Sequence, residues 1–137
     1  NYHFESFFSG TKEYRIHVFG NEMISASKKY FREQYWNEIG RPATFETIRN
    51  NENGWGYYDI QDLENVPELA EKEAIKAVKA LGLIWGAVDI IRTPNNEVFI
   101  LEVNSAPGLR DGRVDLYSRK FVELMNNPER FINQERR

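Results

Sequence analysis

The chain has 137 residues, 41% of them hydrophobic and 28% charged, which is the composition of an ordinary globular domain. Its 18 basic and 21 acidic residues give a net charge of −3, so no basic field favours nucleic acid as a partner. The absence of cysteine excludes disulfides, thiolate zinc sites and cysteine catalysis. No apolar run approaches the roughly 20 residues that span a membrane, and the first residues show no signal-peptide pattern. We therefore expect a cytoplasmic protein without a membrane partner.

The first half of the chain favours short strands joined by turns. Residues 13–19 alternate between apolar and polar side chains, Gly20-Asn21 has the composition of a two-residue hairpin turn, and residues 22–29 predict the return strand. Two further short strands are expected at residues 2–8 and 44–50, with loops at residues 30–44 and 50–56.

The second half predicts two helices on either side of a hairpin. Helix-start signals at residues 65–68 precede apolar residues at helical spacing, and Gly82 ends that run. The hairpin covers residues 83–104, and a second amphipathic helix covers residues 114–125. Phe131 and Ile132 are the only large apolar anchors of the polar tail. The order strands, helix, hairpin, helix predicts a single α+β domain over residues 1–137.

An acidic pair is the most informative feature of the hairpin. Two apolar runs flank a Pro-Asn-Asn turn signal, and a two-residue turn at Asn95-Asn96 places Asp89 directly opposite Glu102. Glu102 and Asn104 are two residues apart, so they lie on one face of their strand. A one-residue slip would send every side chain to the other face. The sequence thus predicts three oxygen-bearing side chains on one patch.

The repulsion between Asp89 and Glu102 must be balanced by another group. Two carboxylates roughly 5 Å apart repel by about 3 kcal/mol at an effective dielectric near 20, and like charges directly opposite destabilise a sheet. A nearby cation or a shared proton relieves the repulsion. Hard oxygen ligands at an open site suit Mg²⁺, which usually also contacts substrate phosphates. The alternative is an incidental acidic pair on a solvated sheet face.

Four segments carry a family resemblance. Residues 102–109 (Glu-Val-Asn-Ser-Ala-Pro-Gly-Leu), with Val-Asp-Ile upstream, resemble the C-terminal end of ATP-grasp ligases. Residues 5–13 resemble the adenine-side hinge followed by the ribose-binding acid, residues 14–20 the strand after it, and residues 48–54 the phosphate-side segment of the glutamate-ligase-like branch. The resemblance covers most of residues 5–125. It implies the C-terminal lobe of an ATP-grasp domain, a mostly antiparallel sheet with two main helices packed on it.

The resemblance also implies roles for individual residues. Asp89, Glu102 and Asn104 correspond to the ligands of Mg²⁺ ions that bridge ATP phosphates. Arg15 and Arg49 would be catalytic, stabilising phosphate or acyl-phosphate charge through the guanidinium fork. The nucleotide-binding residues would be Glu5, Phe7, Phe8, Glu13, Asn50 and Asn53.

Simpler interpretations stand beside these roles. Arg15 could be a surface charge, and Glu5 and Glu13 could be solvated. Phe7 and Phe8 could belong to the core, and Asn50 to Asn53 could serve only turn chemistry. We expect His3 and His17 to be structural or on the surface.

The implied reaction uses ATP to phosphorylate a substrate carboxylate, after which an amine or other nucleophile displaces phosphate from the acyl phosphate. Cofactors would be ATP and Mg²⁺, and the partners a carboxylate substrate and an amine nucleophile, each a peptide or a small molecule. Ala87 stands where D-alanine–D-alanine ligases carry an arginine, and residues 109–112 also differ from theirs. This favours the glutamate-ligase-like branch, with Arg110 and Asp111 near the acceptor.

The family grasps ATP between two lobes, and lysines from strands before the hinge complete the site. Lys12, Lys28 and Lys29 do not correspond to those lysines. We therefore expect residues 1–137 to be the C-terminal portion of an ATP-grasp domain whose N-terminal lobe is absent from this chain, and weak or no ligase activity from the chain alone. The alternatives are a non-catalytic nucleotide- or protein-binding module that keeps the fold, and an unrelated α+β domain without a ligand.

Overall fold

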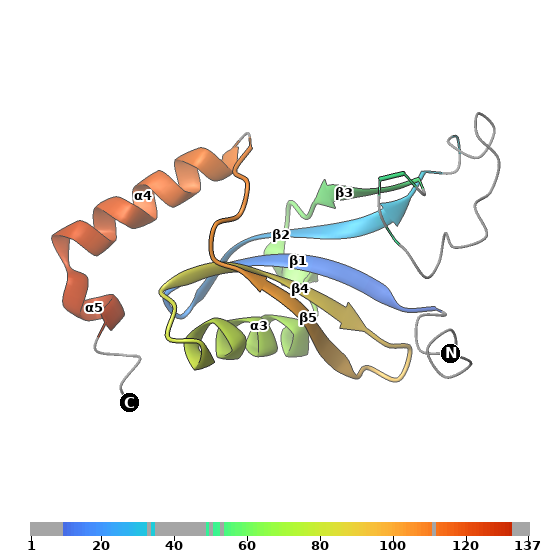
Figure 1. The fold of residues 1–137 in the computed structure, drawn as a ribbon, viewed down its shortest axis with the longest axis horizontal. Helices are drawn as coiled ribbons and strands as arrows, with labels where there is room; N and C mark the ends of the chain where they lie inside the picture. The colour runs from blue at the N-terminus through green and yellow to red at the C-terminus, as the bar shows by residue number, and fades with distance from the viewer. Residues whose placement is uncertain are drawn as a thin grey trace.

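The computed structural model describes residues 10–32, 34, 49, 51–52, 54–110 and 112–132. Its strands are β1 (Lys12–Phe19), β2 (Glu22–Phe31), β3 (Trp55–Asp59), β4 (Trp85–Arg92) and β5 (Val98–Asn104). Its helices are α3 (Glu68–Ala80), α4 (Gly112–Asn126) and α5 (Pro128–Ile132), with a 3₁₀ turn at Leu63–Asn65. The strands form one antiparallel sheet in the order β3-β2-β1-β4-β5 (Figure 1). The predicted α+β class with a mostly antiparallel sheet and two main helices is confirmed.

The first hairpin follows the sequence pattern closely. Gly20-Asn21 is the turn, because Phe19 pairs with Glu22, and Gly20 has the positive φ of 66° that glycine adopts without strain. The return strand reaches Phe31, beyond the predicted end at residue 29. The strands expected at residues 2–8 and 44–50 fall on segments that lie almost wholly outside the described residues.

Strand β3 corrects one prediction, since residues 55–56 were assigned to a loop. Gly56 and the preceding amide-rich residues gave a turn signal, and β3 is only five residues long. Its pairing with β2 fixes it as an edge strand, with Tyr57 opposite Lys29 and Asp59 opposite Ser27. Long-range pairing therefore outweighs local composition here.

Helix α3 covers one face of the sheet. Ala70, Ala74 and Val78 are fully buried against the strands, and their small side chains let the helix approach closely. The sheet contributes a matching set of buried residues, among them Ile16, Val18, Val88 and Ile90. Every second residue of β1 and β4 is thereby committed to the core, and the side chains between them face the other side.

The β4–β5 hairpin confirms the predicted pairing of the two acidic residues but not the predicted two-residue turn. Asp89 is paired with Glu102. The turn is longer than two residues, since Thr93 N–H donates to the Glu97 carbonyl at 2.9 Å. Ile90 pairs with Ile100 and Asp89 with Glu102, so Leu101 is an extra, unpaired residue of β5. This bulge restores the predicted pairing from Asp89 onward.

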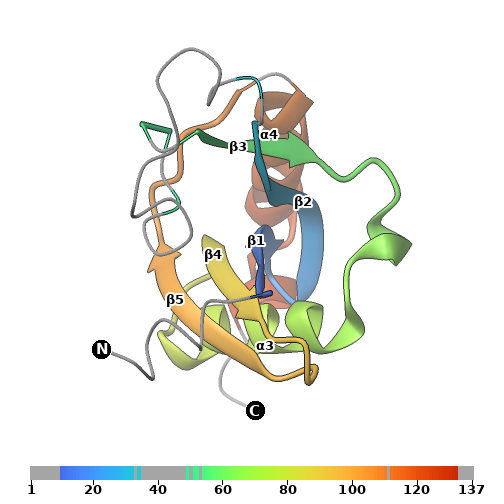
Figure 2. The same ribbon diagram turned by 90° about the vertical axis from the view of Figure 1, so that its right-hand side faces the viewer.

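A second apolar cluster attaches α4 and α5 to the turn end of the first hairpin, on the side of the sheet away from α3 (Figures 1 and 2). Phe19, only 1% exposed, lies at its centre. Its ring stacks on Trp85 at 5.8 Å between centroids and meets Phe121 and Phe131 edge-on at 5.3 and 5.6 Å. Of the two predicted anchors of the tail, Phe131 is buried but Ile132 is 41% exposed, and the short helix α5 was not predicted.

Among the described residues, no helix has both the length and the apolar character needed to cross a membrane.

Candidate functional site

One row of polar side chains crosses the sheet on the face opposite α3. Each strand contributes one residue, and the registers place them side by side: Asp59, Ser27, Arg15, Asp89 and Glu102. The alternation that buries the core residues of β1 and β4 against α3 leaves Arg15 and Asp89 on this face. The site is therefore a direct product of sheet register.

Arg15 and Asp89 form a two-pronged ion pair in the middle of the row. Arg15 Nε donates to Asp89 Oδ1 at 2.8 Å, and Arg15 Nη2 donates to Oδ2 at 3.1 Å. The side chain of Asp89 is 14% exposed and that of Arg15 40%. The hydrogen bonds that Arg15 donates to Asp89 raise the pKa of Arg15, so the guanidinium stays charged. The cation that the acidic pair was predicted to need is present beside Asp89, and Arg15 is not an isolated surface charge.

Tyr57 supports this arrangement from β3. The Arg15 guanidinium lies 4.5 Å from the centroid of the Tyr57 ring, and Lys29 Nζ lies 5.2 Å from the same ring. Burial raises the pKa of Tyr57, so its hydroxyl remains neutral. Ser27, on the strand between Tyr57 and Arg15, has a side chain short enough to let them meet.

Glu102 and Asn104 are exposed on the edge strand β5. The Asn104 side-chain oxygen accepts a hydrogen bond from the Ala106 N–H at 2.9 Å, and Trp85 Nε1 donates to the Ser105 carbonyl at 3.0 Å. These two bonds fix the start of the loop after β5, and with it the orientation of the Asn104 amide.

The donor chemistry of the predicted metal ligands fits Mg²⁺. Asp89, Glu102 and Asn104 offer two carboxylates and an amide oxygen, and each carboxylate oxygen of Asp89 keeps a lone pair beyond the one that Arg15 uses. The part of the chain that the structure describes holds no group of three or more His, Cys, Asp or Glu side chains suited to a metal ion. The predicted set differs from such a group because its third member is an amide.

Glu13 lies on β1 two residues before Arg15, so it is on the same face of the sheet, and it is 6% exposed. Its Oε1 accepts a hydrogen bond from Lys29 Nζ at 3.1 Å, so the alternative of a solvated Glu13 is wrong. Arg49 is also buried; its Nη1 donates to the Thr11 carbonyl at 3.0 Å, and its guanidinium lies 4.9 Å from the Trp55 ring centroid. Both side chains are thus held by the protein at the border of the polar row.

A cleft of about 650 Å³ opens over four members of the row, Asp59, Ser27, Arg15 and Asp89. Two acids, Asp59 and Asp89, and five basic residues line it: Arg15, Lys29, Arg49, Arg110 and Arg113. Cations outnumber acids here although the whole chain is acidic. The cleft is therefore suited to an anionic ligand, and Arg110, predicted near the acceptor, borders it.

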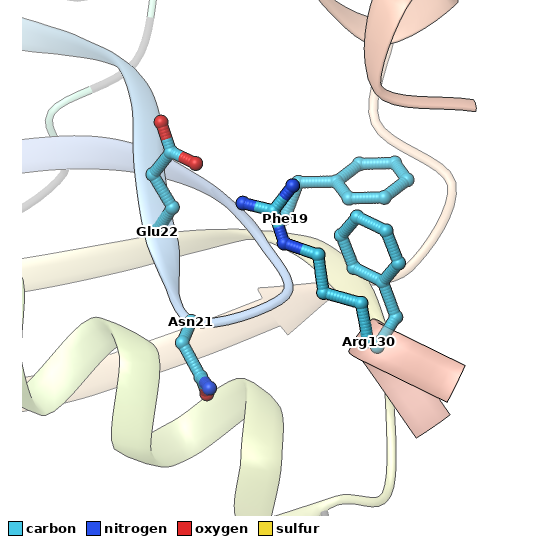
Figure 3. A pocket seen from close by; sticks show the side chains of 5 residues that line it. Phe19, Asn21, Glu22 and Arg130 are labelled. Carbon is cyan, nitrogen blue, oxygen red and sulfur yellow. The ribbon is translucent and has the colours of Figure 1, made fainter. Parts of the chain in front are cut away.

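A second cavity, of about 220 Å³, lies at the β1–β2 turn (Figure 3). Phe19, Asn21, Glu22 and Arg130 border it, together with Phe131. Its walls carry neither member of the acidic pair and no residue of the polar row, so we do not assign it to the site.

Sequence reasoning missed the contribution of α4. Arg113 Nη1 donates to Asp59 Oδ1 at 2.6 Å, and Ser27 Oγ donates to the same oxygen at 2.8 Å. Burial alone would raise the pKa of Asp59, but these hydrogen bonds bring it below its ordinary value. The alternation of Trp55, Tyr57 and Asp59 was a usable strand signal; nothing in the sequence pointed to Arg113.

His17 is structural, which was one of the two predicted alternatives, and it does not lie on the surface. It is 1% exposed, and its Nδ1 lies 2.7 Å from the Tyr117 hydroxyl of α4. Burial, followed by the nearby charges of Arg113 and Arg15, lowers the pKa of His17 to about 4. Burial also raises the pKa of Tyr117 to about 12, so both partners are neutral near pH 7.

We expect His17 to make stability depend on pH. Its pKa is about 4 in the folded protein and about 6.5 when unfolded, so its contribution is full above pH 6.5 and is lost as the pH falls toward 4. A His17→Gln variant lacks the imidazole that becomes protonated between pH 6.5 and pH 4. Urea unfolding should show the stability gap between the two proteins narrowing by roughly 2–3 kcal/mol from pH 7 to pH 4. A gap that stays constant would refute the buried neutral imidazole.

Several predicted residues lie outside the described part of the chain. They are His3, Glu5, Phe7, Phe8, Asn50, Asn53 and Asp111.

The fold is that of ATP-grasp enzymes. It matches the solved structure of the ATP-grasp ligase PsnB complexed with minimal precursor at a TM-score of 0.55 and 16% identity, over 84% of this chain and 34% of that one. A family model described as the RimK-like ATP-grasp domain matches residues 6–118. This chain therefore belongs to the RimK-like ATP-grasp family, and the resemblance noted in the sequence is confirmed.

Curated relatives agree with this assignment. The chain is 36% identical over 101 residues to a probable alpha-L-glutamate ligase of Parasynechococcus marenigrum (strain WH8102), which covers 74% of this chain and 18% of that protein. It is 52% identical over 44 residues to probable alpha-L-glutamate ligase 1 of Shewanella sp. (strain W3-18-1), covering 32% of this chain and 14% of that protein. The chain thus spans less than a fifth of the length of either relative.

Proposed function

We propose that this chain is the ATP- and Mg²⁺-binding lobe of an ATP-dependent carboxylate–amine ligase that works through an acyl phosphate. The observation that carries the proposal is the pairing of Asp89 with Glu102 beside a basic cleft, with Arg15 in a two-pronged contact to Asp89. Family membership supports the same class of reaction. Since ATP is the phosphoryl donor, the proposal includes a cytoplasmic location.

Asp89, Glu102 and Asn104 would hold Mg²⁺, which when bound neutralises phosphate charge during phosphoryl transfer. Arg15 and Arg49 would stabilise the anionic phosphate or acyl phosphate, since their guanidinium groups border the cleft already oriented by Tyr57 and the Thr11 carbonyl. The positions proposed for the nucleotide are Glu5, Phe7, Phe8, Glu13, Asn50 and Asn53.

Arg110 would face the substrates from the loop after β5, as part of the same cleft. The substrates would be a carboxylate and an amine, each a peptide or a small molecule. Two features favour the glutamate-ligase-like branch over dipeptide ligases: the family match and the curated relatives. The nature of the carboxylate would then follow from the loop after β5 and from α4, which close one side of the cleft.

We further propose that residues 1–137 form the C-terminal portion of an ATP-grasp domain. The curated relatives are several times longer than the stretch they share with this chain, and the row of charges lies on a sheet face that α3 leaves free. A second lobe of a longer protein would close over that face and provide the remaining contacts to ATP.

The test is ATP turnover by the longest protein that contains this chain. With ATP and Mg²⁺, repeated turnover to ADP is expected only when both a carboxylate and an amine are added, because the amine must capture the acyl phosphate before the next cycle. No ADP release under any acceptor mixture, together with intact nucleotide binding, would instead identify a non-catalytic nucleotide-binding module with the same fold.

A further inference from the structure

Asp89 already has a cation before any metal arrives. Both of its carboxylate oxygens accept hydrogen bonds from Arg15, at 2.8 and 3.1 Å, and its side chain is largely buried. Glu102 lies directly across the strand pair and carries the same charge as Asp89. Arg15 therefore balances a repulsion that would otherwise destabilise this part of the sheet.

We propose that Arg15 is the resident counter-ion of Asp89 and that a divalent cation binds by exchange with it. This inference rests on the proposed function, because it takes Asp89 and Glu102 as the metal site. It adds a role for Arg15 in setting metal affinity, separate from any contact with phosphate.

Arg15 has a second partner besides Asp89. Its guanidinium lies over the Tyr57 ring at 4.5 Å, on the side of the cleft away from β4, and the side chain is 40% exposed. Lys29, the other cation near this ring, forms an ion pair with Glu13. When the metal takes the Asp89 oxygens, Arg15 can stay on Tyr57 and turn its released N–H groups toward the cleft.

The electrostatic consequence has a definite sign. Arg15 reduces the negative charge of the acidic pair from −2 to −1, and its own positive charge repels a second cation at the same oxygens. Metal affinity in the native protein is therefore weaker than the acidic pair alone would give. An anionic ligand that attracts Arg15 away from Asp89 would raise metal affinity, so metal and anion would bind cooperatively.

The decisive experiment measures Mn²⁺ binding, by electron paramagnetic resonance, to the whole chain and to Arg15→Gln. The substitution is expected to tighten binding by roughly tenfold and to lower the unfolding temperature, because the acidic pair loses its counter-ion. Arg15→Lys keeps the charge and should remain near the native affinity. Lys72→Gln is the charge-matched control, since Lys72 is exposed on α3 and pairs with Glu68.

A second readout needs no substitution. The Nε–H signal of Arg15 in nitrogen-15 NMR should shift when Mg²⁺ is added, as the hydrogen bond to Asp89 breaks. This measurement stands even if Arg15→Gln does not fold.

The outcomes separate the inference from the proposed function. Mn²⁺ binding that Asp89→Asn abolishes but Arg15→Gln leaves unchanged or weakens would overturn the exchange and leave the metal site intact. Equal tightening by Lys72→Gln would also overturn it, because the effect would then be one of net charge. No Mn²⁺ binding that depends on Asp89 or Glu102 would remove the metal site, and the proposed function with it.

Discussion

An Asp89→Asn substitution is expected to weaken Mg²⁺-dependent nucleotide binding by at least about 100-fold in the longest protein that contains this chain. Two effects act in the same direction. The amide has one oxygen and no charge, so it is a poor ligand for a hard cation. It also leaves the Arg15 charge without its carboxylate partner, and that charge then repels the metal.

The comparison with Glu102→Gln sharpens this prediction. Glu102 is exposed and does not hold Arg15, so its loss removes one metal ligand without freeing a cation. We expect a smaller but clear loss of affinity. Nucleotide titrations with and without Mg²⁺ measure both variants, and unchanged affinity in both would refute the metal assignment. Thermal unfolding should change little for Asp89→Asn, since loss of the part-exposed ion pair, about 1 kcal/mol, is offset by relief of the repulsion from Glu102.

Phe19→Ala is expected to have the largest effect on stability, a loss of about 3–5 kcal/mol. Phe19 is 1% exposed and contacts aromatic rings from β4, α4 and α5. A loss of this size is a large part of the 5–15 kcal/mol that typical domains possess. Because α4 is attached to the sheet chiefly through this cluster, its amide protons should lose protection from hydrogen exchange before those of α3.

Urea unfolding and hydrogen exchange test the Phe19 prediction, with Phe99→Ala as the matched control. Phe99 is also a strand phenylalanine, but it is 40% exposed on the edge strand, and its loss should cost about 1 kcal/mol or less. Equal losses for the two variants would show that the aromatic cluster does not anchor α4.

Local patterns were sufficient for much of the fold. Gly20-Asn21 marked the first hairpin. Apolar residues at helical spacing, which end at Gly82, located α3. Each of these signals depends on neighbouring residues only. Strand β3 had a weaker local signal, the alternation of Trp55, Tyr57 and Asp59, and the turn signal at Gly56 outweighed it. Its identity comes from pairing with β2, across more than twenty residues of intervening chain.

The acidic pair was predicted correctly for a partly incorrect reason. The turn at residues 93–97 is longer than assumed, which shifts the register of Ile90 against Ile100, and the bulge at Leu101 reverses that shift before Asp89. Sequence patterns rarely specify a bulge, because its position depends on packing on both faces of the sheet. The ion pair to Arg15 was likewise out of reach, since it joins strands that are distant in the chain.

The charges lining the cleft are mostly neutralised within the protein. Arg15 pairs with Asp89, Lys29 with Glu13 and Arg113 with Asp59, so three of the five cations that line the cleft have a carboxylate within about 3 Å. Such dipolar pairs produce a field that decays much faster with distance than that of a bare charge, and dissolved salt screens what remains beyond roughly 10 Å. These three pairs therefore add little to the long-range attraction of an anion, and they contribute to selection among anions through how well each bound anion reorganises them.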